Sequence, residues 1–258
     1  MDQQALMQQT EDRCDNYAML SRLFRSELDR ELVGDLIDSP AVESTGNALF
    51  DSGYARLRSY LDAVDDLDRA KSALAIDYCL AFLGYGVDPE KADEAGRNAA
   101  YPYESVYTSE RRLLMQEARA EVLATLRENE LKRGNWNEAE DHIALELEFM
   151  QRMALRAAEA LSDNAEDEAI AYLRTSYDFL ENHLLNWVPM LVADMRMHAR
   201  TLFYQGLGQL TLDSLHGRGP CLAQGGRHRA AFRRGVHCPR SGPQADDRSA
   251  GKRRTAAL

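Results

Sequence analysis

The sequence predicts an all-α fold, a single-domain helical bundle of about eight to ten helices. Residues 1–216 are dominated by helix-forming residues, and apolar residues recur three and four positions apart. No segment shows the strict alternation of apolar and polar residues that marks a half-buried strand. A chain of 258 residues, 45% of them hydrophobic, is long enough to bury a core as one domain.

The N-terminal part of the chain predicts a succession of helices. In the first, Tyr17, Leu20, Leu23 and Phe24 recur at helical spacing and form one apolar face. The second ends before Pro40, because a proline disfavours helical geometry in the residue that precedes it. We expect these helices at residues 10–27, 28–38, 41–51, 53–64 and 69–83.

A segment rich in turn residues, 84–109, interrupts the helical pattern. Loops of this length in compact domains are usually functional or disordered. The segment ends in an aromatic cluster in which Tyr101, Tyr103 and Tyr107 surround Pro102. Two interpretations stay open for this cluster: a binding surface, or ordinary core packing.

The C-terminal part predicts further helices with clear start signals. Ser109 is a suitable N-cap for a helix that begins at Glu110. Asn137, followed three residues later by Glu140, is a variant of the capping box. Pro189 fits the first turn of the last helix, where a missing N–H costs nothing. We expect these helices at residues 110–132, 137–161, 165–186 and 188–215.

Composition argues against several classes of protein. No stretch of about 18 uncharged apolar residues is present, so a transmembrane protein is not expected. The first twenty residues carry acids where a secretion signal needs basic and then apolar residues, so we expect a cytoplasmic protein. The cysteines are far apart and form no C-x-x-C motif, which argues against a disulfide scaffold and a zinc knuckle. They are Cys14, Cys79, Cys221 and Cys238.

Charge divides the chain into two parts. Residues 1–216 hold 21 Lys and Arg against 40 Asp and Glu, a net charge of −19, whereas residues 217–258 hold 10 against 2, a net charge of +8. The second segment is rich in Gly, Arg and Pro and has too few apolar residues to offset its ordering entropy. It is either a disordered basic extension or GC-rich DNA translated out of frame, and we favour the second explanation.

One helix carries polar groups on its apolar face. On a helix from Asn137, His142 and Glu146 fall within the arc of Ile143 and the other apolar residues, whereas Asp141 falls outside it. One interpretation is a partly buried histidine that is satisfied by Glu146, beside acids that act as helix caps. The other is a hydrolytic enzyme with an acid–base site at Asp141, His142 and Glu146. The sequence contains no H-E-x-x-H motif, nucleophile elbow or phosphate-binding loop.

Several stretches together resemble a known family. They are YAMLSRLF (17–24), ALAIDYCLAFLG (73–84), YPYESVYTSERRLLMQ (101–116), EAEDHIALELEFM (138–150) and FLENHLLNWVPM (179–190). In this order and spacing they resemble the TorD/DmsD/NarJ family of cytoplasmic redox-enzyme maturation chaperones. The resemblance covers most of residues 10–216. Residues 1–216 would then form the chaperone domain, and the tail, 217–258, lies outside the resemblance.

The resemblance implies an all-helical binding protein without catalysis or a cofactor of its own. Members bind the twin-arginine signal peptide of a molybdopterin-dependent oxidoreductase, hold the apo form of that catalytic subunit, and assist cofactor loading and assembly before export. They do not bind nucleic acid or insert stably into membranes. They occur as monomers or domain-swapped dimers, and GTP binding has been proposed for some. The client oxidoreductase and the oligomeric state of this chain stay open.

The family's motifs map onto this sequence residue by residue. Its E-P-x-D-H signature falls on residues 138–142, with Ala139 in place of the usual proline, and its P-x-x-S-V-[YFW] segment falls on residues 102–107. The resemblance and the helical spacing together give an expected signal-peptide-binding set. That set is Pro102, Tyr103, Ser105, Tyr107, Glu138, Asp141, His142 and Glu146.

A binding mechanism follows from the chemistry of such a peptide, which has two guanidinium groups followed by an apolar helix. Carboxylates of Asp141 and Glu138 would pair with the arginines, and Tyr103 and Tyr107 would line an apolar groove. His142 would orient Asp141 or titrate near neutrality. The acidic body would attract a cationic peptide, although an acidic excess also serves solubility. A third possibility is an all-α scaffold protein that binds an unrelated partner helix.

The segment Arg111-Arg112-Leu113-Leu114-Met115 looks like a twin-arginine motif itself. It lies in the middle of the chain and inside a predicted helix, whereas export signals are N-terminal. We therefore interpret Arg111 and Arg112 as surface charges.

Overall fold

The computed structural model describes residues 3–42, 44–85, 99–132 and 134–216. In these residues the chain is all-α, as the sequence predicts, and an isolated β-bridge between Tyr103 and His142 is the only strand-like pairing. The basic tail, residues 217–258, and residues 86–98 of the 84–109 segment lie outside the described residues. The helices are α1 (Gln3–Arg25), α2 (Arg30–Asp38), α3 (Ala48–Asp62), α4 (Leu67–Phe82), α5 (Glu104–Thr108), α6 (Glu117–Glu128), α7 (Ile143–Ser162), α8 (Glu166–Phe179), α9 (Leu185–His198) and α10 (Leu202–Leu215), and a π-helical turn, η2 (Leu180–Leu184), joins α8 to α9.

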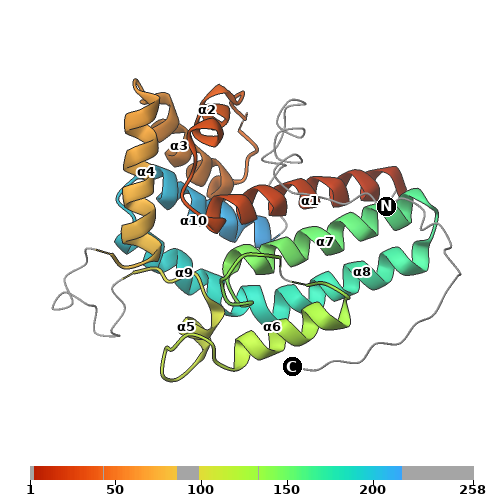
Figure 1. Ribbon diagram of the computed structural model, residues 1–258. Helices are drawn as coiled ribbons and strands as arrows, with labels where there is room; N and C mark the ends of the chain where they lie inside the picture. The colour runs from red at the N-terminus through yellow and green to blue at the C-terminus, as the bar shows by residue number, and fades with distance from the viewer. Residues whose placement is uncertain (1–2, 43, 86–98, 133, 217–258) are drawn as a thin grey trace, which may run out of the picture.

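The helices form one bundle in which neighbours in space are often distant in sequence (Figure 1). The N-terminal helix α1 packs along α7, and α7 packs along α8. At the other end of the bundle α10 packs on α3 and α9, and α4 contacts α2 and α9. The short helix α5 lies between α6 and α9.

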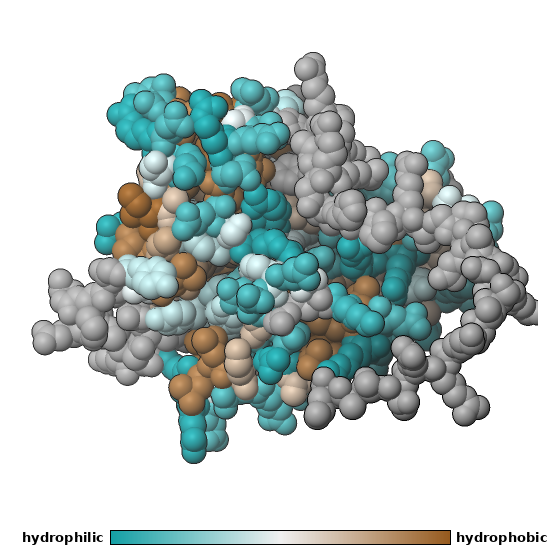
Figure 2. All heavy atoms as spheres, viewed as in Figure 1, coloured by the Kyte–Doolittle hydropathy of each residue, from teal (hydrophilic) through white to brown (hydrophobic). Residues whose placement is uncertain are grey.

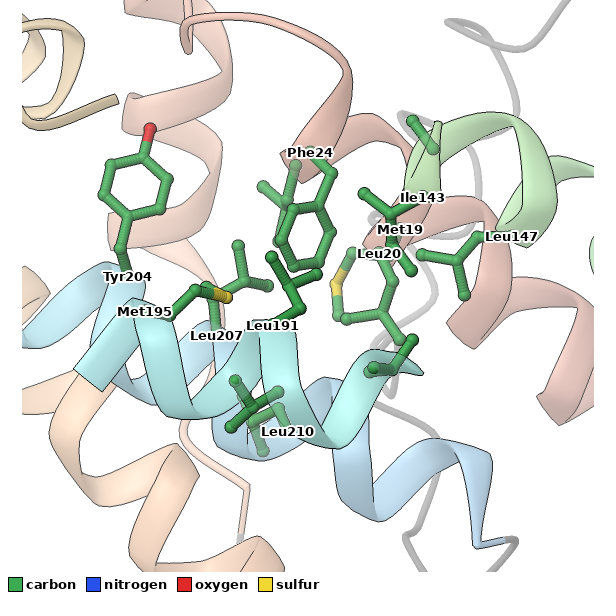
Figure 3. Packing of buried hydrophobic residues seen from close by; sticks show 14 of the residues in the cluster. Met19, Leu20, Phe24, Ile143, Leu147, Leu191, Met195, Tyr204, Leu207 and Leu210 are labelled. Atoms are coloured by element: carbon green, nitrogen blue, oxygen red, sulfur yellow. The ribbon is translucent and has the colours of Figure 1, made fainter. Parts of the chain in front are cut away.

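A single large hydrophobic cluster connects these layers. Figure 3 shows Leu191 and Met195 of α9 facing side chains from α1, α7 and α10. Leu20, Leu147 and Leu207 in this cluster are fully buried. Burial of such side chains is the main force that holds the bundle together.

Two glycines let α3 and α10 approach closely. A Cβ atom on Gly206 would lie 2.6 Å from the carbonyl oxygen of Gly53 and 2.7 Å from the backbone nitrogen of Leu57. A Cβ atom on Gly53 would lie 2.9 Å from the side chain of Gln209. A larger residue at position 206 therefore has to push the two backbones apart, which a close-packed interior resists.

The predicted helix at residues 41–51 is wrong. One helix, α3, begins at Ala48 and runs through most of the helix that was predicted separately at residues 53–64. Asn47 is the N-cap of α3, because its side-chain oxygen accepts hydrogen bonds from the backbone N–H groups of Leu49 and Phe50. The carboxylate of Asp51 accepts a hydrogen bond from the backbone nitrogen of Thr45 at 3.0 Å. These two side chains hold the preceding segment as a turn rather than as helix.

The predicted helix at residues 110–132 is also too long at both ends. Ser109 is the C-cap of α5 and not the N-cap of the next helix, which begins at Glu117. Arg112 and Met115 have φ angles of 53° and 59°. Because left-handed geometry interrupts an α-helix, residues 109–116 form an exposed connection between α5 and α6.

The two predicted C-terminal helices divide elsewhere than expected. Helix continues from Glu166 through η2 to His198, and the break falls at residues 199–201. Pro189 therefore lies inside α9 and not at its start. The π-helical turn directly precedes the first turn of α9, in which Pro189 has no N–H to donate. π-Helical turns commonly accompany such an interruption of the helical hydrogen bonds. Among the described residues, no helix combines the length and apolarity that crossing a membrane requires.

The glycine pair gives a stability prediction. Gly206→Ala should destabilise the protein by about 1–3 kcal/mol, because the new methyl group overlaps the backbone of α3. Gly34, in the middle of α2, is the control, because a Cβ there would meet only the Leu67 side chain at an ordinary 3.8 Å. Gly34→Ala should stabilise by about 0.5–1 kcal/mol through helix propensity. Urea unfolding would measure both, and equal effects of the two changes would contradict the close approach.

Candidate functional site

Two segments that are distant in sequence pair at the start of α7. The backbone nitrogen of Ile143 donates to the carbonyl oxygen of Pro102 at 2.9 Å, and the nitrogen of Glu104 donates to the carbonyl oxygen of Asp141 at 2.9 Å. These bonds flank the bridge between Tyr103 and His142. The structure thus brings together the two segments that the sequence singled out, 102–107 and 138–146.

Asp141 fixes the start of α5. Its Oδ2 atom accepts a hydrogen bond from the backbone nitrogen of Ser105 at 2.9 Å and another from the Ser105 hydroxyl. The Ser105 hydroxyl oxygen accepts in turn from the backbone nitrogen of Gln116 at 3.1 Å. Asp141 and Ser105 are both 0% exposed. A buried charge-assisted bond of this kind stabilises the local structure by about 1.5–3 kcal/mol.

The helical projection placed Asp141 wrongly, outside the buried arc. The helix begins at Ile143 with His142 as its N-cap, so the proposed capping box of Asn137 and Glu140 does not form. Glu140 instead pairs with Arg119, with 2.6 Å between Oε2 and Nε. Because Asp141 precedes the helix, angles of 100° per residue do not apply to it, and its burial cannot be read from them.

His142 is a buried, neutral helix cap. Its Nδ1 atom accepts a hydrogen bond from the backbone nitrogen of Ala144 at 3.0 Å. The rings of Tyr103 and Trp136 meet the imidazole edge to face, with ring centroids 4.9 Å and 4.8 Å away. Burial, and secondly the nearby Arg25 charge, lower the pKa of His142 from its usual 6.5 to about 3. The expectation that His142 titrates near neutrality is therefore wrong.

Glu146 lies deeper in the same network. It is 0% exposed, and its Oε2 atom accepts a hydrogen bond from Nε1 of Trp187 at 3.1 Å. Burial raises the pKa of Glu146 well above its usual 4.5, and the charge of Glu104 raises it further. The ring of Tyr107 stacks on Trp187 with centroids 5.5 Å apart. The carboxylate of Glu146 therefore bonds to Trp187, and the ring of His142 bonds to the backbone of Ala144. The interpretation in which Glu146 satisfies His142 is wrong.

Three partly exposed side chains connect this buried network with the protein surface. Tyr103, Trp136 and Glu138 are half-buried, and the Tyr103 hydroxyl donates a hydrogen bond to Oε2 of Glu138. Burial, followed by this hydrogen bond, raises the pKa of Tyr103, so the phenol stays protonated. The guanidinium of Arg25 lies 4.5 Å from the centroid of the Trp136 ring. This surface therefore combines a carboxylate with aromatic rings, and one ring already carries a guanidinium.

The expected site residues divide by accessibility. Tyr103, Tyr107 and Glu138 keep partial exposure. The other expected residues are buried: Pro102, Ser105, Asp141, His142 and Glu146. In this structure Asp141 cannot contact the arginine of a bound peptide, because its side chain has no accessible surface. Burial of Asp141, His142 and Glu146 also argues against the hydrolytic alternative, because a substrate has no access to them.

The structure adds residues that the sequence reasoning did not select. Glu104 is 3% exposed, and its Oε2 atom lies 2.9 Å from Nδ1 of His183 in the π-helical turn. Tyr107 donates to Asp194 at 3.1 Å, and Trp187 connects Tyr107 with Glu146. His183 and Trp187 lie in the 179–190 stretch that carries the family resemblance. That stretch was the available signal, because nothing in their spacing predicts contacts with residues far away in the sequence.

His142 gives a pH prediction. The unfolded chain takes up a proton at His142 below pH 6.5, whereas the folded protein does not until pH is near 3, so acid lowers stability across that window. Asn at position 142 keeps an N-cap acceptor and removes this proton. Between pH 7 and pH 5, both proteins lose free energy of unfolding. The loss for His142→Asn should be about 2 kcal/mol smaller than the loss for the wild type. Urea unfolding at both pH values would measure this, and His216→Asn, at an exposed position, should match the wild type.

Glu146 predicts the opposite pH dependence. The folded protein keeps Glu146 protonated above pH 4.5, whereas the unfolded chain ionises it, so stability is lost as pH rises through this range. In Glu146→Gln the carboxamide oxygen still accepts from Trp187, and the variant should gain on the wild type by up to about 1.4 kcal/mol per pH unit. Unfolding curves at pH 5, 7 and 9 would measure the gain. Glu128→Gln, at an exposed position of α6, is the control, and parallel pH profiles of Glu146→Gln and wild type would contradict the assignment.

Comparison with known proteins agrees with the resemblance read from the motifs. Residues 47–193, more than half of the chain, match the family described as nitrate reductase delta subunit. The chaperone protein TorD of Vibrio vulnificus (strain YJ016) is 30% identical over 185 residues, which cover 69% of this chain and 80% of that protein. TorD of Vibrio cholerae (strain ATCC 39541) is 29% identical over 223 residues, 82% of this chain and 92% of that protein.

A third relative is TorD of Aliivibrio fischeri, which is 28% identical over 192 residues, 69% of this chain and 80% of that protein. The matched family region includes the paired segments 102–107 and 138–146 and the π-helical turn. The all-helical architecture and these matches agree with one another. The chain therefore belongs to the TorD/NarJ family of chaperones.

Proposed function

We propose that this protein is a cytoplasmic maturation chaperone that binds the twin-arginine signal peptide of a molybdopterin-dependent oxidoreductase. It holds the apo form of that catalytic subunit while the cofactor is loaded, and it has no catalysis or cofactor of its own. Membership of the TorD/NarJ family supports the chaperone role. Residues 1–216 form the chaperone domain, as a monomer or a swapped dimer.

The observation that carries the proposal is the pairing of segments 102–107 and 138–146 below a partly exposed surface. On that surface Glu138 supplies a carboxylate, and Tyr103 and Trp136 supply rings. A carboxylate beside aromatic faces is suited to a guanidinium, which forms bidentate hydrogen bonds and stacks on rings. The cation–π contact between Arg25 and Trp136 is an internal example of this chemistry.

The buried members of the expected set have a different role in this proposal. Asp141 and Ser105 fix α5 relative to α7, and His142 caps α7 directly under Tyr103. Glu146 holds Trp187, on which Tyr107 stacks. We assign these residues to positioning the recognition surface rather than to contact with the peptide.

Binding of a signal peptide tests the proposal directly. A synthetic twin-arginine signal peptide from an oxidoreductase whose gene adjoins this one should bind by calorimetry. Glu138→Gln should weaken this binding about tenfold, because it removes the charge that faces an arginine but leaves an acceptor for Tyr103. Glu128→Gln, which removes an equal charge from an exposed position at the end of α6, should have little effect. Lack of affinity for every such peptide would refute the proposed function.

A further inference from the structure

The guanidinium of Arg25 lies on the ring of Trp136, one of the side chains of the proposed recognition surface. The Cζ atom of Arg25 is 4.5 Å from the centroid of this ring. The Nη1 atom of Arg25 also donates a hydrogen bond to Oε2 of Glu148 at 2.9 Å. A ring together with a carboxylate suits a guanidinium, which stacks on rings and forms charge-assisted hydrogen bonds. The protein therefore already holds, on the Trp136 ring, the chemical group that a twin-arginine peptide would bring.

Two hydrogen bonds fix the backbone that carries Arg25. The Ser21 hydroxyl donates to the carbonyl oxygen of Ala144 at 2.7 Å, and this buried bond attaches the end of α1 to the start of α7. The Tyr78 hydroxyl donates to the carbonyl oxygen of Phe24 at 3.0 Å. Because Ser21 and Arg25 are four positions apart on one helix, they share a face, and Arg25 is directed at the start of α7. Uncovering the Trp136 ring therefore requires only that the Arg25 side chain turns.

The contact between Arg25 and Trp136 lies at the surface of the protein. The side chains of Arg25 and Glu148 are 32% and 28% exposed, and Trp136 is half-buried. Figure 2 shows mainly hydrophilic and intermediate side chains over the region where Figure 1 places the end of α1 and the start of α7. A contact between a cation and a ring is weak at such a surface, because water competes for the charge. A second guanidinium with further contacts of its own can therefore displace Arg25.

We propose that Arg25 is a built-in competitor of the signal peptide, whose guanidinium covers the Trp136 ring in the free protein and is replaced there by an arginine of the bound peptide. The inference rests on the proposed function and adds the step that opens the site. The incoming arginine stacks on Trp136 beside the carboxylate of Glu138, while Arg25 keeps its ion pair with Glu148.

This competition makes the site selective. A ligand with a single cation displaces Arg25 and gains only the contact that Arg25 loses. A twin-arginine peptide adds a second guanidinium and an apolar stretch, so its binding outweighs the displacement. Arg25 thus lowers the affinity for all cations and leaves the paired arginines as the favoured ligand.

Removal of the competitor should strengthen binding. Arg25→Gln should bind a fluorescently labelled twin-arginine peptide about threefold more tightly than the wild type, because the ring no longer has to be vacated. Trp136→Leu should weaken binding. In the Trp136→Leu background, Arg25→Gln should bring little gain, since no ring remains to be uncovered. Anisotropy titrations of the wild type, the two single variants and the double variant would measure this coupling.

A matched control separates competition for the ring from the change in net charge. Arg156, further along α7, lies over the ring of Tyr172 with 5.7 Å between Cζ and the ring centroid. Arg156→Gln therefore removes an equal charge and a contact of the same kind away from the proposed surface, and it should bind the peptide like the wild type. Thermal unfolding of each variant would verify that it is folded.

The outcomes distinguish this inference from the proposed function. If the wild type binds the peptide and Arg25→Gln binds it no more tightly than Arg156→Gln does, Arg25 is not a competitor, and the proposed function survives. An equal gain from Arg25→Gln with and without the Trp136 ring would also overturn the inference. If Trp136→Leu does not fold, the comparison of Arg25→Gln with Arg156→Gln decides. If neither the wild type nor Arg25→Gln binds any twin-arginine peptide, both proposals fail.

Discussion

The buried contact between Asp141 and Ser105 holds together the two segments on which the proposed recognition surface lies. It attaches the short helix α5 to the residues that lead into α7, and the backbone bonds on either side of the Tyr103–His142 bridge reinforce it. A helix as short as α5 is not stable by itself, because helix nucleation is costly. Asp141 supplies what the short helix lacks, because its carboxylate satisfies a backbone N–H at the start of α5.

Burial of ionisable groups around this contact sets their protonation. His142 stays neutral, so its ring nitrogen can accept a hydrogen bond from the start of α7. Glu146 favours the protonated form for the same reason, since burial penalises the charged state of either group. The site therefore has a chemical state different from the one that the residue types suggest. Asp141, His142 and Glu146 do not form an acid–base catalytic site here, because all three side chains are buried away from solvent.

In the proposed function, recognition of the signal peptide is left to the side chains that remain accessible. These are the carboxylate of Glu138 and the rings of Tyr103 and Trp136. The acidic body attracts cations in general, whereas a carboxylate flanked by aromatic rings adds selectivity for a guanidinium. The Leu113–Met115 turn is exposed and not helical, because left-handed residues at 112 and 115 interrupt the helical geometry before α6 begins.

The sequence by itself determined the fold class, the family and the two segments that meet at the site. Helical periodicity and short motifs are local properties, so they can be read without coordinates. Sequence alone misplaced helix ends at Asn47, Ser109 and Asn137, since several residues there can cap a helix and tertiary contacts decide which one does. Only the tertiary structure decided that Asp141 is buried against Ser105 and that Glu104, His183 and Trp187 join the network. Those contacts join residues 36 to 79 positions apart, and their burial, which sets exposure and pKa, is a property of the packed bundle rather than of any segment.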